Sequence, residues 1–104
     1  MTANSEPLEV RDNPAAQRFE VQLDQHLAIA EYRRSPGVIT FIHTEVPAAF
    51  RGRGVAGLLV EAALDQAAAR GDEVVPLCSF VAAYIAQRPR YQTLVPARYQ
   101  HLLR

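Results

Sequence analysis

The segment Arg51–Ala56 has the composition of an anion-binding loop, with two glycines, two arginines and small residues. It lies between a β-branched stretch and an alanine- and leucine-rich stretch, so a strand is expected to run into a glycine turn that opens a helix. The first N–H groups of a helix point outward at the positive end of its dipole, which suits a phosphate or pyrophosphate. The predicted binding residues of this loop are Arg51, Gly52, Arg53, Gly54, Val55, Ala56 and Gly57.

Three further residues are candidates for proton transfer or nucleophilic chemistry. His43 and Glu45 are two positions apart on the expected strand, so they share one face and can serve one proton path. The pKa of a histidine suits proton transfer near neutral pH. Cys78 ends the strand after the helix and precedes the next helix, whose N-terminus favours a thiolate. The plain alternatives are a solvated carboxylate, a structural histidine and a buried cysteine that packs as a small hydrophobe.

The elements that must position these residues follow from the hydrophobic pattern. Alternating or β-branched runs predict three strands, Phe19–Leu23, Leu27–Arg33 and Val38–Val46, joined by short turns into an antiparallel meander. Residues 1–14 lack such a pattern and are expected to be a flexible leader, and 15–104 to form a single domain.

The second half of the chain predicts helices. Val55–Arg70 contains good helix formers and ends before Gly71, which fits a helix stop. Its expected buried stripe is Val55, Leu58, Leu59, Ala62 and Ala63.

After this helix we expect Val74–Cys78 to be a strand at a sheet edge or a splay, because Pro76 cannot donate to a central ladder. Ser79 is the expected N-cap of a helix that runs to about Gln87. The tail holds a last short strand or turn and a helix over Ala97–Leu103. The order β-β-β-α-β-α predicts an α/β (α+β) fold, with a mixed, mainly antiparallel sheet and helices packed on it.

The charge balance, the single cysteine and the lack of a long apolar segment limit the partners and cofactors that we expect. Eleven basic residues balance eleven acidic ones, which argues against a nucleic-acid partner. Cys78 is the single cysteine, so no intrachain disulfide and no cysteine metal cluster can form, and no metal is expected. No apolar targeting or membrane segment is visible, so the expected location is the cytoplasm and the expected state a monomer or weak dimer.

Two other phosphate loops do not match: there is no P-loop pattern and no dinucleotide fingerprint. The loop instead resembles the Arg/Gln-x-x-Gly-x-Gly/Ala signature of the GCN5-related N-acetyltransferases. Together with His43–Pro47 and Pro76–Ser79, it is similar to their short, single-domain YidJ-like or NATD1-like branch. The resemblance spans about residues 15–95 and implies acetyl-CoA as acyl donor, bound through its pyrophosphate at the loop.

The resemblance also implies roles for individual residues. The strand before the loop would offer a backbone donor at Val46 and a base at Glu45, with His43 on the same proton path. Cys78 and Ser79 would lie beside the pantetheine arm, where two strands splay. Tyr84 corresponds to a tyrosine that protonates the leaving thiolate, although a core-packing tyrosine fits its context better. The turn that contains Arg88, Arg90 and Tyr91 either meets the adenine or 3′-phosphate or is a solvated basic turn.

Several alternatives stay open at this point. The chain lacks the pair of helices that build the acceptor pocket in many relatives, so the acceptor amine is not identified. Transfer can be direct or pass through an acetyl group on Cys78. A coenzyme A-binding module without turnover and a small acyl-CoA thioesterase are the two rival functions.

Overall fold

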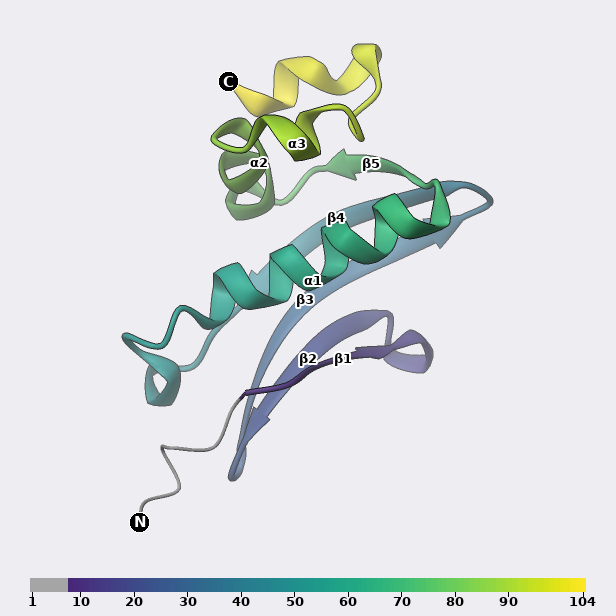
Figure 1. Ribbon diagram of the computed structural model, residues 1–104. Helices are drawn as coiled ribbons and strands as arrows, with labels where there is room; N and C mark the ends of the chain where they lie inside the picture. Colours follow the sequence, from purple (N-terminus) through teal and green to yellow (C-terminus); the bar gives the residue numbers. More distant parts are fainter. Residues whose placement is uncertain (1–7) are drawn as a thin grey trace.

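The computed structural model describes residues 8–104 and shows a five-stranded sheet with one long helix across a face (Figure 1). The strands lie in chain order: β1 (Val10–Asn13), β2 (Arg18–Leu23), β3 (His26–Ser35), β4 (Val38–Glu45) and β5 (Glu73–Pro76). Neighbours from β1 to β4 are antiparallel, whereas β5 runs parallel to β4 after the helical crossover. The predicted mixed, mainly antiparallel α/β fold is therefore confirmed.

Strand β1 corrects the expectation of a flexible leader over residues 1–14. Val10–Asn13 pairs with β2, from Val10 opposite Val21 to Asn13 opposite Arg18. A side-chain bond fixes this edge strand, because Tyr32 Oη donates to Asp12 Oδ1 at 2.6 Å. A short 3₁₀ turn, η2 (Pro14–Ala16), then leads into β2. Residues 1–7, the rest of the expected leader, lie outside the described residues.

Helix α1 (Val55–Arg70) covers the sheet face that carries the core. It ends at Gly71, whose positive φ of 73° and N–H bond to Ala67 and Ala68 carbonyls fit the predicted stop. The buried stripe differs from the expected one at Leu58, which is 37% exposed, and at Ala62, which is only half-buried. The residues of α1 that are buried are Val55, Leu59, Val60, Ala63, Leu64 and Ala67.

The C-terminal third packs beside the β5 edge as α2 (Ser79–Ala86), α3 (Pro89–Gln92) and the 3₁₀ helix η4 (Ala97–Leu103) (Figure 1). Ser79 is the first residue of α2, not its N-cap. Cys78 holds the cap position without a side-chain hydrogen bond. Pro76 lies in the edge strand, as predicted. In residues 8–104, no helix combines the length and the apolar character needed to cross a membrane.

Candidate acyl donor site

The loop before α1 is a pair of left-handed glycines anchored by a buried phenylalanine. After β4 the chain forms a 3₁₀ turn, η3 (Ala48–Phe50), in which Phe50 is buried. Gly52 and Gly54 then take φ values of 79° and 66°, a region that L residues with a side chain rarely adopt. No atom lies within 4 Å of a Cβ built on either glycine, so the space beside this backbone is open.

The start of α1 is left without a side-chain cap. Its N-cap is Gly54, which has no side-chain oxygen, and the first intrahelical bond is donated by Leu58 to the Gly54 carbonyl at 3.1 Å. The N–H groups of the first turn, from Val55 to Gly57, therefore have no acceptor within the helix. Arg51 is exposed beside this end of α1, and the binding of an anion there stays a prediction.

A β-bulge in β4 changes which side chains face the core. Tyr32 pairs with Phe41, but the preceding Glu31 pairs with His43, so Ile42 is an extra residue on β4. Side chains alternate along a strand, and directly paired residues share a face. Beyond the bulge Thr44, opposite the buried Ala30, faces the core, while His43 faces the other side with Glu31.

His43 and Glu45 are consequently together but away from Cys78. Their side chains share a face, as expected, with His43 Nε2 3.3 Å from Glu45 Oε1, and they are 55% and 67% exposed. The hypothesis that this pair activates Cys78 does not match the structure, because the bulge turns both residues to the outer face. A role for either residue toward a substrate on that face stays a prediction.

Thr44 is the residue that sequence reasoning missed. Its Oγ1 lies 3.4 Å from Sγ of Cys78, which is buried with 8% of its surface exposed. A bulge has no fixed sequence signature, and the β-branched and aromatic run from Val38 to Glu45 was interpreted as one regular strand. The only available signal was that Thr44 lies between the two candidates.

Strands β4 and β5 separate beside this threonine and cysteine. Their ladder ends where Phe41 pairs with Pro76, and the Cys78 N–H makes a last bond to the Phe41 carbonyl at 2.8 Å. From Ile42 onward, β4 pairs only with β3 within residues 8–104. The predicted splay at Pro76 is thus present, and it leaves an edge of β4 to which an extended ligand can bind.

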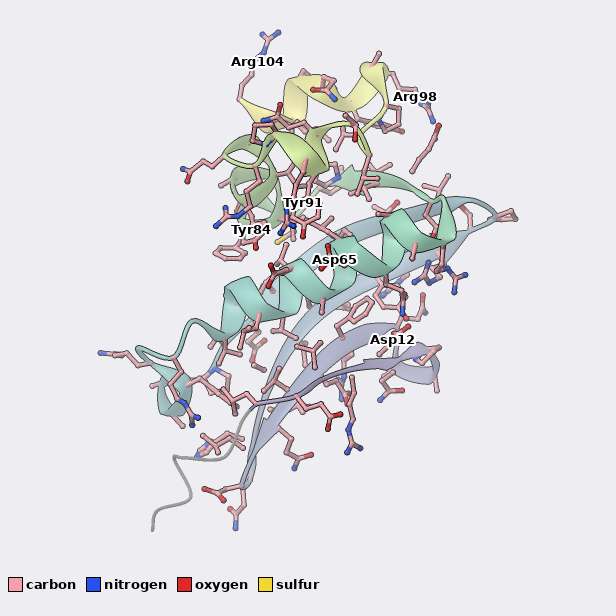
Figure 2. The ribbon with its side chains drawn as sticks, viewed as in Figure 1. Asp12, Asp65, Tyr84, Tyr91, Arg98 and Arg104 are labelled. Carbon is pink, nitrogen blue, oxygen red and sulfur yellow. The ribbon has the colours of Figure 1, made fainter. Side chains whose placement is uncertain are left out.

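Helix α2 lies beside the region where β4 and β5 separate. Tyr84 projects from α2 toward α1 (Figure 2), where its ring is 3.7 Å from a Cβ built on Gly57. Gly57, one of the predicted binding residues of the loop, therefore has this tyrosine ring beside it. Tyr84 is half-buried and packs against the core cluster, and its role in proton transfer stays a prediction.

A protein-family model matches the part of the chain that contains these features. Residues 18–94, from β2 to the end of the α2–α3 region, match the model of the GCN5-related N-acetyl-transferase. The chain belongs to the GCN5-related N-acetyltransferase family. The matched span includes the glycine loop, the bulge, the splay and Cys78.

Similar proteins place the chain in a particular branch of the GCN5-related N-acetyltransferases. Protein NATD1 from chicken and from mouse are each 32% identical over 92 residues, which cover 85% of this chain and 83% of each relative. The solution structure of a GCN5-like protein from Staphylococcus aureus is 25% identical, with a TM-score of 0.68, and covers 86% of this chain and 88% of its own. The expected NATD1-like branch is confirmed.

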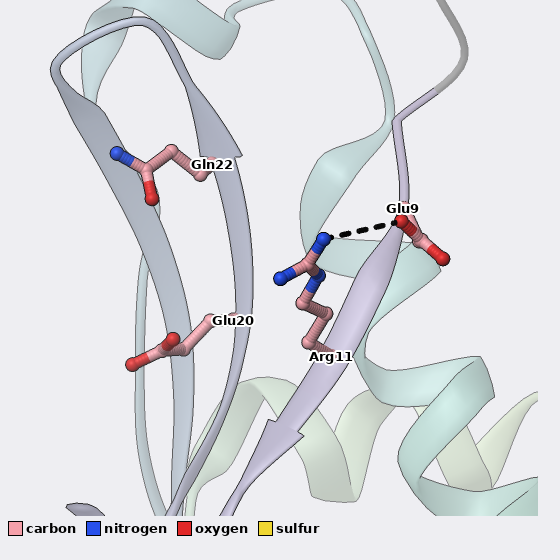
Figure 3. A pocket seen from close by; sticks show the side chains of 4 residues that line it. All are labelled: Glu9, Arg11, Glu20 and Gln22. Carbon is pink, nitrogen blue, oxygen red and sulfur yellow. Dashed lines mark ion pairs between the residues drawn. The ribbon is translucent and has the colours of Figure 1, made fainter.

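A pocket lies away from the loop, on the outer side of β1 and β2 (Figure 3). It has a volume of about 300 Å³ and is lined by Glu9, Arg11, Glu20 and Gln22. Glu9 and Arg11 are highly exposed and 3.8 Å apart. The pocket shares no lining residue with the loop, α1 or α2. Among residues 8–104, no group of three or more histidine, cysteine or acidic side chains is placed to hold a metal ion.

Proposed function

We propose that this chain is an acetyl-CoA-dependent N-acetyltransferase that transfers the acetyl group to an amine. Membership of the GCN5-related family supports N-acetyl transfer in general. The observation that carries the specific proposal is the continuity of the glycine loop, the uncapped start of α1 and the splay at Phe41 and Pro76. In this proposal they form one path, from an anion site at the loop to the buried thiol of Cys78.

The loop end of this path fits the pyrophosphate of coenzyme A. The first-turn N–H groups from Val55 to Gly57 would donate to its oxygens, and the open space at Gly52 and Gly54 lets those oxygens approach the backbone. The Arg51 side chain is exposed at the same place and adds positive charge.

The sheet end fits an extended pantetheine arm and a small acyl group. The edge of β4 after Phe41 offers backbone groups of the kind that a neighbouring strand would pair. Thr44 and Cys78 face each other there, and Val46 follows on the same stretch of chain. When bound, the thioester would supply the activated acyl group, while these residues would orient it.

The route of transfer stays open between direct attack and a Cys78 intermediate. In the first route the amine nitrogen forms the new C–N bond, the C–S bond breaks and the proton leaves to a base. In the second, the Cys78 sulfur forms a new thioester while the original C–S bond breaks and coenzyme A leaves with the thiol proton. The amine then displaces the Cys78 sulfur, which takes up the amine proton. Burial of Cys78 and its contact with Thr44 favour a lining residue, and therefore direct attack.

One observation supports a second candidate, a coenzyme A-binding module without turnover. The bulge turns His43 and Glu45 away from Cys78, so the predicted base does not lie beside the predicted acyl end. An acceptor that reaches over the β4 edge could still contact Glu45. The two functions are separated by whether an amine accelerates release of coenzyme A.

The test measures release of free coenzyme A from acetyl-CoA with and without a panel of amines, together with the intact mass of the protein. We expect amine-dependent release. Release without any amine would indicate a thioesterase, and binding with no release would indicate a module. All eleven basic residues are arginine, so no lysine can be acetylated and confuse the mass measurement. An added acetyl mass lost in Cys78→Ala would identify the intermediate.

The site is tested with paired charge variants. Arg51→Ala with Arg53→Ala should reduce acetyl-CoA binding and release alike. The matched control is Arg98→Ala with Arg104→Ala, which removes the same charge at the C-terminal end of the molecule, away from the loop (Figure 2). If both double variants lose binding equally, the effect is one of net charge and the proposed site is wrong.

A further inference from the structure

The two edges of the sheet differ in how their backbone groups are satisfied. At the β5 edge the C-terminal segment lies alongside, since the Val74 N–H donates to the Leu94 carbonyl at 2.9 Å. Strand β1 forms the opposite edge (Figure 1), and within residues 8–104 it pairs only with β2. The side of β1 away from β2 therefore presents backbone N–H and C=O groups to which a further strand can bind.

Strand β1 has few of the features that keep an edge strand from pairing. Val10–Asn13 contains no proline, and its register with β2 has no bulge. The bond from Tyr32 to Asp12 holds the strand in its extended form. Charged side chains are present, but Glu9 and Arg11 have opposite signs. Charges of one sign would repel a second copy of this edge, whereas one charge of each sign can attract it.

Glu9 and Arg11 are also the charges that this edge can offer to a partner (Figure 3). Their side chains are 78% and 76% exposed, and their charged atoms are 3.8 Å apart. On β2, Arg11 lies opposite Glu20. Glu20 Oε2, however, already accepts from Arg18 at 2.6 Å and from Asn13 at 3.0 Å. Within residues 8–104, the only carboxylate within 4.0 Å of Arg11 is that of Glu9.

The order of these two charges selects one register for a second copy. If Val10 lies opposite Val10 of the second copy in an antiparallel pair, each Glu9 lies opposite an Arg11. The neighbouring registers that keep the two outer faces on the same side place Glu9 opposite Glu9, or Arg11 opposite Arg11. Like charges directly opposite each other destabilise a strand pair, whereas opposite charges stabilise it. A two-fold axis at Val10 therefore gives two favourable pairs and no unfavourable one at these positions.

We propose that two copies of this chain associate through their β1 edges, in an antiparallel pairing centred on Val10 that joins the two sheets into one. The partner is a second copy because the edge is complementary to itself in this register. Strand β1 has four residues, so the interface is small and the dimer forms only at high protein concentration. The loop, β4, β5 and α2 lie away from this edge (Figure 1), so the inference is independent of the proposed function.

The test is sedimentation equilibrium of the full chain at low salt and rising protein concentration. The average mass of the wild type should rise from the 11.5 kDa of one chain toward twice that value. Glu9→Arg places arginine opposite arginine, and Arg11→Glu places glutamate opposite glutamate. In each single variant the dissociation constant of the dimer should rise about tenfold or more, because two attractive pairs become repulsive.

A mixture of the two single variants tests the register itself. In an equimolar mixture of Glu9→Arg and Arg11→Glu, each pair again combines opposite signs, so the two variants should associate with each other. The double variant should associate with itself for the same reason. The amide resonances of Val10–Asn13 should shift with protein concentration in the wild type and in the double variant, and stay constant in each single variant.

Arg33→Glu is the matched control. Arg33 is an exposed arginine of β3 that lies 3.2 Å from Glu31, and reversing its charge should leave the dissociation constant of the dimer unchanged. A wild type that stays monomeric up to millimolar concentration would overturn the inference, as would a mixture that stays monomeric. Single variants that associate as well as the wild type, equal weakening by Arg33→Glu, or association without a change at Val10–Asn13 would overturn it too.

Discussion

Gly54→Ala separates the conformational need for glycine in the loop from its role in ligand binding. Gly54 has a φ of 66°, and an alanine there costs about 1 kcal/mol because its Cβ approaches the backbone carbonyl. Apart from Gly54 itself and its two chain neighbours, no atom lies within 4 Å of the added methyl, so no further steric cost arises in the ligand-free protein. For a domain of this size, about 1 kcal/mol lowers the Tm by about 4–8 °C.

Acetyl-CoA provides the second part of the measurement. At a concentration of about 100 times Kd, a ligand that binds only the folded protein stabilises it by about 2.7 kcal/mol. The methyl of Gly54→Ala would occupy the space through which the pyrophosphate oxygens reach the backbone. A tenfold weaker Kd then removes about 1.3 kcal/mol of that stabilisation at the same ligand concentration.

Gly37→Ala is a closely matched control for this variant. Gly37 lies in the hairpin between β3 and β4, has a φ of 72°, and also has no atom within 4 Å of a built Cβ. Thermal unfolding with and without acetyl-CoA should show similar ligand-free Tm losses in both variants. The Tm increase caused by acetyl-CoA should shrink only in Gly54→Ala. An equal increase in the two variants would refute the assignment of the loop.

Three further predictions concern single groups. Cys78 should react with a thiol reagent more slowly in the folded protein than in denaturant, and more slowly still with acetyl-CoA; His43→Ala should leave these rates unchanged. Burial and a hydrogen bond to a carboxylate raise the pKa of Tyr91 above its ordinary 10.0. The stability that this shift contributes is therefore lost as the pH rises above 10. In urea titrations, Tyr91→Phe should lose less stability than the wild type over this alkaline range. Arg18 Nε lies 2.6 Å from Glu20 Oε2 and lowers the pKa of Glu20 below its ordinary 4.5. The stability that this shift contributes is lost as the pH falls below 4.5, so Arg18→Ala should lose less stability in acid than the wild type. An equally steep acid loss in the variant would contradict this prediction.

Much of the fold could be predicted because its elements have strong local signals. The Arg51–Arg70 segment combines glycines that need a positive φ with a run of good helix formers, and both features depend on few distant contacts. Pro76 likewise marked the edge strand, since its missing N–H excludes a central position.

The errors came from features that depend on distant partners. Val10–Asn13 has one apolar residue, and it is a strand because β2 pairs with it and Tyr32 binds Asp12. The bulge at Ile42 depends on how β3 and β4 align over their full length, and it moved Thr44 to the core face. Leu58 had helical spacing toward the core, but the packing of α1 on the sheet leaves it partly exposed.

Binding of acetyl-CoA at the glycine loop is best tested by titrating ¹⁵N-labelled protein with acetyl-CoA and following the backbone amide resonances. We expect the largest changes at Gly52–Gly57 and at Cys78, with smaller changes along α2. We expect little change at Glu20 and Gln22, which line the outer pocket at β2. Saturable changes confined to that outer pocket, or no saturable change at Gly52–Gly57, would contradict binding at the loop.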